Sequence, residues 1–314
     1  MAQKTAFFFP GQGSQSVGMM SGFGDNPVIK QTFVEASDIL GVDFWSMATE
    51  PNELLNQTQH TQPLMLIAGL ATYRAYIAAG GLPANIHAGH SLGEYTALVA
   101  SNALSFSDAL PLVKFRAEAM QSAVPEGVGA MAAILGLDDD IVRAVCAEAA
   151  NDFKLNDEVC EAVNFNSPGQ VVIAGNKAAV ERGMEIAKAK GAKRALPLPV
   201  SVPSHCALMK PAAEKLAEYL KNVTIQAPKI PVIHNADVAS YSNSDQIKYA
   251  LVRQLYSPVR WVETVQAIYA QGITNSAECG PGKVLAGLTK RIVAELPCSA
   301  LTNNDAIKEF IKIN

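Results

Sequence analysis

The segment Gly89-His90-Ser91-Leu92-Gly93 has the Gly-x-Ser-x-Gly spacing of a nucleophile elbow. In such an elbow, a sharp turn between a strand and a helix exposes a serine hydroxyl, and small residues around it prevent steric clashes. Free N–H groups at the start of the helix can stabilise an oxyanion. A tight turn with an incidental serine would give the same letters, so the pattern alone is weak. It makes Ser91 the candidate nucleophile.

A serine hydroxyl is a poor nucleophile at neutral pH, so Ser91 needs a base, and histidine is the usual one because it titrates near neutrality. His90 adjoins Ser91, but neighbouring residues on such a turn tend to point apart, which favours a structural role. His205 lies in a proline-bearing loop at 202–206, and the pattern alone leaves it one of several candidates. The others are His60 in a polar loop, His87 in the strand before the elbow and His234 at the end of a later strand.

Two short strands and a glycine-rich loop are predicted around the elbow. The apolar segment Thr5 to Phe9 ends at Pro10-Gly11, and Ile86 to Ala88 leads into the elbow, after which Glu94 to Ala100 has good helical propensity. The loop at 11–15 lacks the Gly-Lys-Ser/Thr ending of a P-loop and the glycine spacing of a dinucleotide site. A nucleotide-phosphate cradle is therefore disfavoured.

Two longer helices are predicted beside these elements. From Pro63 to about Ala79 the chain is apolar on nearly every face, which predicts a buried helix with Pro63 in its first turn. Ser107 is expected to cap a helix that runs to Met120 and has Pro111 in its first turn.

Residues 127–199 show a different order of elements, β-α-β-β-α-β, which is the ferredoxin-like pattern. We expect a small inserted subdomain there, and a large subdomain made of residues 1–126 and 200–314. Strands that alternate with helices in the large part predict an α/β fold with a mainly parallel sheet covered on both faces. The insertion has strands at 129–135, 160–164, 170–174 and 192–198 and helices at 138–150 and 177–190. After it come strands at 231–235 and 275–279, and helices at 245–255, at 260–271 and after 282.

The composition is that of an ordinary globular protein. With 314 residues, 49% of them hydrophobic and 17% charged, the chain can bury a large core. Its formal net charge of -4 and scattered positive residues disfavour nucleic acid or an anionic membrane as partner. The apolar run before Pro10 is too short for a signal peptide, and no segment resembles a membrane span, so we expect a cytoplasmic protein. Five cysteines without paired spacing predict reduced thiols rather than disulfides or a zinc site.

Eight motifs occur together and in order along almost the whole chain. Any one of them is weak, but the set resembles the bacterial malonyl-CoA:acyl carrier protein transacylases of fatty acid synthesis, which are related to the acyltransferase domains of polyketide synthases. The motifs are Phe9-Pro-Gly-Gln-Gly-Ser-Gln15, Thr61-Gln-Pro63, Gly89-His-Ser-Leu-Gly93, Phe115-Arg-Ala-Glu-Ala-Met120, Asn166-Ser-Pro-Gly-Gln170, Val202-Pro-Ser-His205, Gln254-Leu-Tyr-Ser-Pro258 and Gly280-Pro-Gly282.

The resemblance implies an α/β-hydrolase-like large subdomain with a ferredoxin-like small one. It also implies that Ser91 is acylated and that His205 is the base. In the family the base is steered by a main-chain carbonyl, here that of Gln254, and not by an acid. Backbone N–H groups matching Gln12 and Leu92 would form the oxyanion hole.

The acyl group is expected to meet two further residues. Arg116 matches the arginine that holds the malonyl carboxylate, although a lone helical arginine is more often solvated or salt-bridged. Met120, one helical turn further on, would share its face and line the acyl pocket.

A neutral histidine base predicts a rate that rises through an apparent pKa near about 6 to 7.

The implied reaction passes malonyl from malonyl-CoA to Ser91 and then to the phosphopantetheine thiol of acyl carrier protein. It needs no metal or bound cofactor, and a monomer would suffice. A serine hydrolase and a noncatalytic carrier-protein-binding module are the competing interpretations. The malonyl or methylmalonyl preference and a polyketide pathway stay open, although Ser204 before His205 favours the fatty acid enzymes. An acidic carrier protein would need a basic patch, for which the candidates are Lys188, Lys190, Lys193 and Arg194, or Lys283, Lys290 and Arg291.

Overall fold

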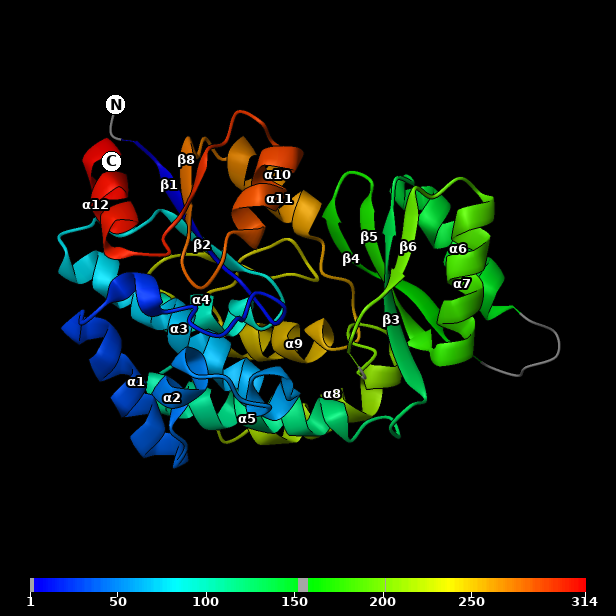
Figure 1. Cartoon of the computed structure of the whole chain (residues 1–314), viewed down its shortest axis with the longest axis horizontal. Coiled ribbons are helices and arrows are strands. Elements are labelled where there is room, and N and C mark those ends of the chain that lie inside the picture. The colour runs from blue at the N-terminus through cyan, green and yellow to red at the C-terminus, as the bar shows by residue number, and fades with distance from the viewer. Residues whose placement is uncertain (1–2, 152–157, 201) are drawn as a thin grey trace.

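The computed structural model describes residues 3–151, 158–200 and 202–314. Two sheets organise the chain, and Figure 1 shows the smaller one at one end of the molecule with its two helices on the outer face. Within the described residues, no helix is long and apolar enough to cross a membrane.

The large sheet has five parallel strands in the order β7-β2-β1-β8-β9, which confirms the predicted α/β fold with a parallel sheet. Strand β1 is central, between β2, which leads to Ser91, and β8. The strands are β1 (Thr5–Phe9), β2 (Ile86–Gly89), β7 (Val232–Ile233), β8 (Asn275–Glu278) and β9 (Cys298–Ala300).

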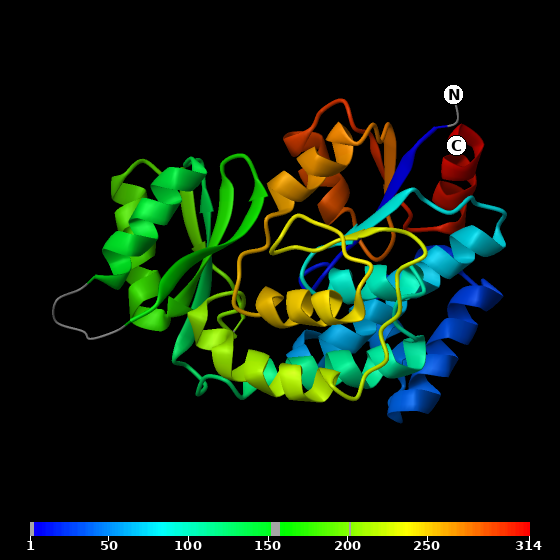
Figure 2. The ribbon, with the colours of Figure 1, turned by 180° about the vertical axis from the view of Figure 1, so that it is seen from behind.

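Helices cover both faces of this sheet because alternate side chains of β1 enter two separate cores. Phe7 and Phe9 pack with side chains of α1, α3, α4 and α5, whereas Phe8 packs with side chains of α10 and α11. Seen from behind, α8 and α9 run side by side below the sheet (Figure 2). The helices are α1 (Pro27–Leu40), α2 (Phe44–Thr49), α3 (Thr58–Ala78), α4 (Gly93–Ala100), α5 (Phe106–Gln121), α8 (Lys210–Leu220), α9 (Ser244–Gln254), α10 (Trp261–Ala270), α11 (Val284–Ile292) and α12 (Asn304–Ile313).

The small sheet is antiparallel, with the order β4-β5-β3-β6, and the chain enters its elements as β-α-β-β-α-β. This order of elements is the one predicted for residues 127–199, although the exact boundaries of the insertion stay a prediction. The elements are β3 (Gly129–Leu135), α6 (Asp139–Ala150), β4 (Cys160–Ser167), β5 (Gln170–Asn176), α7 (Lys177–Ala189) and β6 (Arg194–Pro197).

Main-chain hydrogen bonds join the small sheet to the large part of the molecule. The Val259 N–H donates to the Val163 carbonyl over 2.8 Å, and the Phe165 N–H donates to the Val259 carbonyl over 3.0 Å. Strand β4 is therefore tied directly to the segment that precedes α10.

Two predicted helix starts were wrong. Helix α3 begins at Thr58, so His60 lies in a helix and Pro63 in the second turn. Helix α5 is capped by Ser105 and not Ser107, because the Ser105 hydroxyl accepts from the Asp108 N–H over 3.0 Å; Pro111 then also falls in the second turn. The sequence interpretation also did not identify α1, α2, α8, β9 and α12.

Candidate active site

Ser91 lies at the sharp turn between β2 and α4, as the elbow motif predicted. Its φ of 51° is in the left-handed region, which a residue with a side chain rarely adopts. The turn needs its two glycines: a Cβ on Gly89 would lie 1.9 Å from the Gly93 carbonyl oxygen, and one on Gly93 would lie 1.9 Å from the Phe9 carbonyl oxygen. The tight packing explains the Gly-x-Ser-x-Gly spacing.

His205 is brought to Ser91 across 114 residues of sequence, and its Nε2 lies 2.8 Å from the Ser91 Oγ. Its Nδ1 lies 2.7 Å from the Gln254 main-chain oxygen, which can only accept a hydrogen bond. Nδ1 therefore carries the proton, and Nε2 is the free acceptor for the serine hydroxyl. His205 also has a left-handed φ, 67°.

The environment of His205 keeps the imidazole neutral. Burial lowers its pKa from 6.5 to about 3, and the positive charge of Arg116 acts in the same direction, although the bond to the Gln254 carbonyl opposes them. This lowered pKa differs from the value near neutral pH that the sequence analysis expected for the base. The base is already deprotonated well below neutral pH.

The residues predicted for an oxyanion hole lie beside the Ser91 hydroxyl. Leu92 is the N-cap residue of α4, and both Leu92 and Gln12 line the same pocket as Ser91. The glycine-rich loop approaches the elbow closely, since a Cβ on Gly11 would lie 2.5 Å from the His90 carbonyl oxygen and 3.6 Å from the Leu92 nitrogen. The side chain of Gln12 reaches Thr58 at the start of α3, with 3.3 Å between Nε2 and Oγ1.

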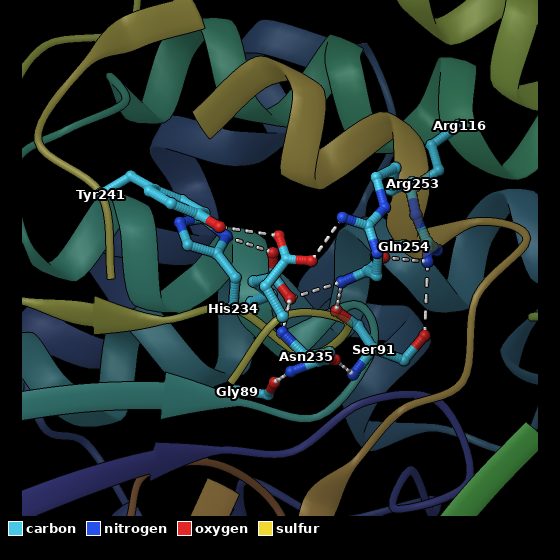
Figure 3. A network of polar contacts seen from close by, with 10 residues as sticks. Gly89, Ser91, Arg116, His234, Asn235, Tyr241, Arg253 and Gln254 are labelled. Carbon is cyan, nitrogen blue, oxygen red and sulfur yellow. Dashed lines mark hydrogen bonds and ion pairs between the residues drawn. The ribbon is translucent and has the colours of Figure 1, made fainter. Parts of the chain in front are cut away.

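Arg116 on α5 is 1% exposed, and its guanidinium points toward Ser91 (Figure 3). Nη1 donates to the Gln62 Oε1 over 2.7 Å, and Nη2 donates to the Gln254 Oε1 over 2.9 Å and to the Ser91 Oγ over 3.3 Å. The guanidinium also lies 5.3 Å from the centre of the Tyr95 ring. Within the described part of the chain, Nε has no hydrogen-bond partner. The arginine is thus neither solvated nor salt-bridged.

A pocket with about 670 Å³ of empty space opens above these groups. Met120 lines it beside Arg116, and the Met120 sulfur lies 3.7 Å from the Gln62 Nε2. The opposite wall includes Met131 of β3 and Asn164 of β4, so the pocket lies between the two sheets. All seven residues predicted for the site are brought together. Six of them line the pocket, and Gln254 contacts His205 and Arg116. The seven residues are Gln12, Ser91, Leu92, Arg116, Met120, His205 and Gln254.

Comparison with known proteins agrees with this geometry. Residues 6–302 match the acyl transferase domain family. The chain is 54% identical to the malonyl CoA-acyl carrier protein transacylase of Escherichia coli K12, over 98% of this chain and 99% of the relative. The chain belongs to the malonyl CoA-acyl carrier protein transacylases.

Solved structures give the same result. The acyl-carrier-protein S-malonyltransferase of Burkholderia pseudomallei is 59% identical and superimposes with a TM-score of 0.96, covering 99% of this chain and 100% of the other. A malonyl-transacylase in complex with a type II PKS acyl-carrier protein is 50% identical, with a TM-score of 0.96 and the same coverage. The fold of this transacylase is therefore that of its relatives throughout.

Asn235 holds the elbow of the transacylase from below, a contact that sequence reasoning missed. Its Oδ1 accepts from the Ser91 N–H over 2.7 Å, and its Nδ2 donates to the Gly89 carbonyl over 2.7 Å (Figure 3). One side-chain amide thus bridges both arms of the turn. It stabilises the left-handed conformation at Ser91.

Three other histidines of the transacylase have partners away from the Ser91 hydroxyl. His90 Nε2 lies 2.8 Å from the Asn166 Oδ1 of β4, which agrees with the structural role predicted for it. His87 is fully buried, with its Nδ1 2.9 Å from the Ser101 Oγ, and His234 Nδ1 lies 2.6 Å from the Glu94 Oε1.

The transacylase shows no metal centre among its described residues, in which no three His, Cys, Asp or Glu side chains gather. All five cysteines are free thiols, and four of them are buried.

Proposed function

We propose that the chain transfers malonyl from malonyl-CoA to the phosphopantetheine thiol of acyl carrier protein through an ester on Ser91. Transfer of malonyl to carrier protein is the activity of its family. The observation that carries the role of Ser91 is the chain of two hydrogen bonds from the Ser91 hydroxyl through His205 to the Gln254 carbonyl.

In the first half-reaction, His205 Nε2 takes the proton of the Ser91 hydroxyl while the oxygen attacks the thioester carbonyl. The oxyanion is held by the N–H groups of Gln12 and Leu92. When the tetrahedral intermediate collapses, the imidazolium returns its proton to the sulfur, and CoA leaves as a thiol. The Gln254 carbonyl supports the imidazolium by accepting from Nδ1.

The second half-reaction reverses these steps with another thiol. His205 deprotonates the carrier thiol, its sulfur attacks the malonyl ester, and the proton returns to the Ser91 oxygen as that bond breaks. The kinetics are expected to be ping-pong, and the steps as written need neither metal nor cofactor. All the proposed groups come from one chain, which supports a monomer as the functional unit.

Intact-mass measurement after incubation with malonyl-CoA alone tests the proposal. A transacylase accumulates a stable malonyl adduct on Ser91, because water is a poor substitute for the carrier thiol. Rapid production of malonate without an adduct would indicate a serine hydrolase, and neither product would indicate a noncatalytic binding module. The partner of His205 Nδ1 is the Gln254 main-chain carbonyl and not a carboxylate, which disfavours the hydrolase.

The malonyl carboxylate is proposed to bind Arg116. A carboxylate that enters a partly dry pocket loses hydration, and only a charged donor can offset that loss. The guanidinium faces Ser91, has an unpaired Nε and lines the pocket. Gln62 and Gln254 hold its two terminal nitrogens without neutralising it.

Replacing Arg116 with alanine should lower kcat/KM for malonyl-CoA by at least roughly 10- to 150-fold, the effect of losing one charged hydrogen bond. Acetyl-CoA has no carboxylate and should be affected little. The measurement is kcat/KM for both thioesters, with Arg116→Lys as the control that keeps the charge but not the planar fork. Equal losses for both acyl groups would assign Arg116 to the fold or to the CoA moiety.

A polyketide carrier is a second candidate acceptor, because one similar structure is a malonyl-transacylase bound to a type II PKS acyl-carrier protein. Comparing kcat/KM for fatty acid and polyketide carrier proteins separates the two roles. Ser204, which lines the pocket before His205, supports the fatty acid role, and the choice between malonyl and methylmalonyl stays open. A cytoplasmic location stays a prediction.

Carrier docking is proposed to use one of two exposed basic clusters. The first contains Lys188, Lys190, Lys193 and Arg194 near the end of α7 and in β6; the second contains Lys283, Lys290 and Arg291 at the two ends of α11. The second is supported by its neighbour Gly282, where a Cβ would lie 3.6 Å from the Ser14 oxygen of the glycine-rich loop. Lys190 of the first cluster already pairs with Glu148, 3.0 Å away.

Reversing the charges of the second cluster should raise KM for the carrier protein and leave the rate of acylation by malonyl-CoA unchanged. The reason is that only the second half-reaction involves the acidic partner. Reversal of the first cluster is the matched control, measured by the same two assays. If neither reversal changes KM, docking does not depend on these charges.

A further inference from the structure

Glu94 is a carboxylate buried directly beneath the elbow. It lies in the first turn of α4 and is 0% exposed. Its Oε1 lies 2.6 Å from the His234 Nδ1, and its Oε2 accepts from the Asn235 N–H and from the Gln254 Nε2, both over 2.9 Å. A neutral imidazole with a protonated Nδ1 is sufficient to make the first of these contacts.

The side-chain amide of Gln254 lies between Glu94 and Arg116. Its Nε2 donates to Glu94 and to the Ser91 carbonyl, and its Oε1 accepts from the Arg116 Nη2 (Figure 3). A carbonyl can only accept and a guanidinium can only donate, so these neighbours fix the orientation of the amide. Its dipole thus has the positive end toward the carboxylate and the negative end toward the cation.

The buried positive charge of Arg116 needs compensation, and this arrangement supplies it. A buried charge is strongly destabilising unless another charge or strong hydrogen bonds compensate it. Among the described residues, Arg116 forms no ion pair within 4.0 Å. Burial lowers the pKa of its guanidinium, and the neighbouring Tyr95 and Glu94 act in the opposite direction. A carboxylate in direct contact would balance the charge but would compete with the substrate.

We propose that Glu94 is the counter-charge of Arg116, and that Gln254 holds it one amide away so that the guanidinium stays free for the substrate carboxylate. The inference rests on the proposed role of Arg116 in binding malonyl. It makes Glu94 a positioning and charge-balancing residue that never touches the acyl group.

The variant Glu94→Gln tests the charge separately from the geometry. Its amide oxygen can still accept from Asn235 and Gln254, while its NH₂ group can face His234, whose ring can present an unprotonated Nδ1. The guanidinium then lacks its resting counter-charge and should bind the malonyl carboxylate more tightly. We expect the dissociation constant for malonyl-CoA to fall by about 3- to 10-fold, since charges several ångströms apart in a protein interact at an effective dielectric near 20.

The binding measurement uses the hydrolysis-resistant pair of malonyl-CoA and acetyl-CoA thioether analogues. The acetyl analogue should bind with unchanged or lower affinity, so the malonyl-to-acetyl preference should increase in Glu94→Gln. A purely structural role of Glu94 would weaken both analogues equally and would not strengthen either. Equal weakening, or no change, would overturn the proposal.

Two matched variants serve as controls. Glu94→Asp keeps the charge and should keep the wild-type preference. Asp237→Asn makes the same carboxylate-to-amide change in a side chain that already pairs with Arg253, 2.6 Å away, and should not alter the preference.

A stability cycle keeps the proposal testable if Glu94→Gln is too unstable for binding studies. Thermal unfolding is compared for Glu94→Gln, Arg116→Met and the double variant. If the two charges balance each other, the decrease in Tm of the double variant should be clearly smaller than the sum of the decreases of the two single variants. Additive losses would reject the pairing.

The Arg116→Ala experiment distinguishes failure of this inference from failure of the proposed anion site. If Arg116→Ala changes the acyl preference but Glu94→Gln does not, only the role of Glu94 is wrong. If Arg116→Ala affects both acyl groups equally, the anion site itself is wrong.

Discussion

Replacing Ser91 with alanine is expected to abolish malonyl transfer and the covalent adduct while the protein stays folded. The hydroxyl is the proposed attachment point of the acyl group, and among the described residues it forms hydrogen bonds only with His205 and Arg116. No core packing depends on it, since the side chain is half-buried at the pocket. Intact mass after incubation with malonyl-CoA and the carrier-dependent rate are the measurements.

Thermal unfolding of Ser91→Ala provides the control for folding, and Ser204→Ala removes a second pocket hydroxyl as a matched comparison. Ser204→Ala should retain the adduct. Detection of malonyl on a residue other than Ser91 in the unmodified protein would contradict the assignment.

Replacing His205 with alanine should slow acylation by roughly 10²- to 10⁴-fold, the usual contribution of a general base. The Nε2 atom lies 2.8 Å from the Ser91 Oγ, where it can take the Ser91 proton, and the variant leaves that hydroxyl without this acceptor. The rate of adduct formation is measured in a single turnover. His60→Ala, which removes a histidine from α3 without touching Ser91, should keep most of the activity.

The pH dependence of the unmodified enzyme tests the same role. A base acts when it is neutral, which is the case above its pKa, and a pKa lowered to about 3 moves the acidic limb of the rate profile well below neutrality. The acylation rate should therefore be flat from about pH 6 to 8, in contrast to that of an unperturbed histidine with a pKa near 6.5. A rise centred on the unperturbed value would show that His205 is solvated in the free enzyme.

Much of the local structure could be predicted because it follows from short-range patterns. Strand β1 and strand β3 have the predicted bounds, and the β-α-β-β-α-β order of the small sheet follows from the hydrophobic patterning of its segments. The start of α3 was missed because a proline in the second turn looks, in sequence, like one in the first. The amphipathic helix α8 was also missed, although its leucine and alanine spacing is a visible signal.

The supporting network could not be predicted because it depends on contacts between distant segments. Glu94 meets His234, Asn235 and Gln254, which follow it by 140, 141 and 160 residues. No spacing rule connects residues so far apart. A glutamate at the start of a helix is expected to be solvated and to interact favourably with the helix dipole. The motif around Ser91 predicted the reacting group, whereas only the folded chain shows which residues hold the elbow in place.

Four non-glycine residues of the described chain have a positive φ, and two of them, Ser91 and His205, carry the proposed reacting groups. A side chain in this region of backbone space destabilises a protein by about 1 to 3 kcal/mol, and glycine would remove most of that strain. A related protein that kept the fold without the transfer reaction would gain stability from glycine at both positions. The proposed reaction needs a serine and a histidine at these two positions, so it is kept at the expense of stability.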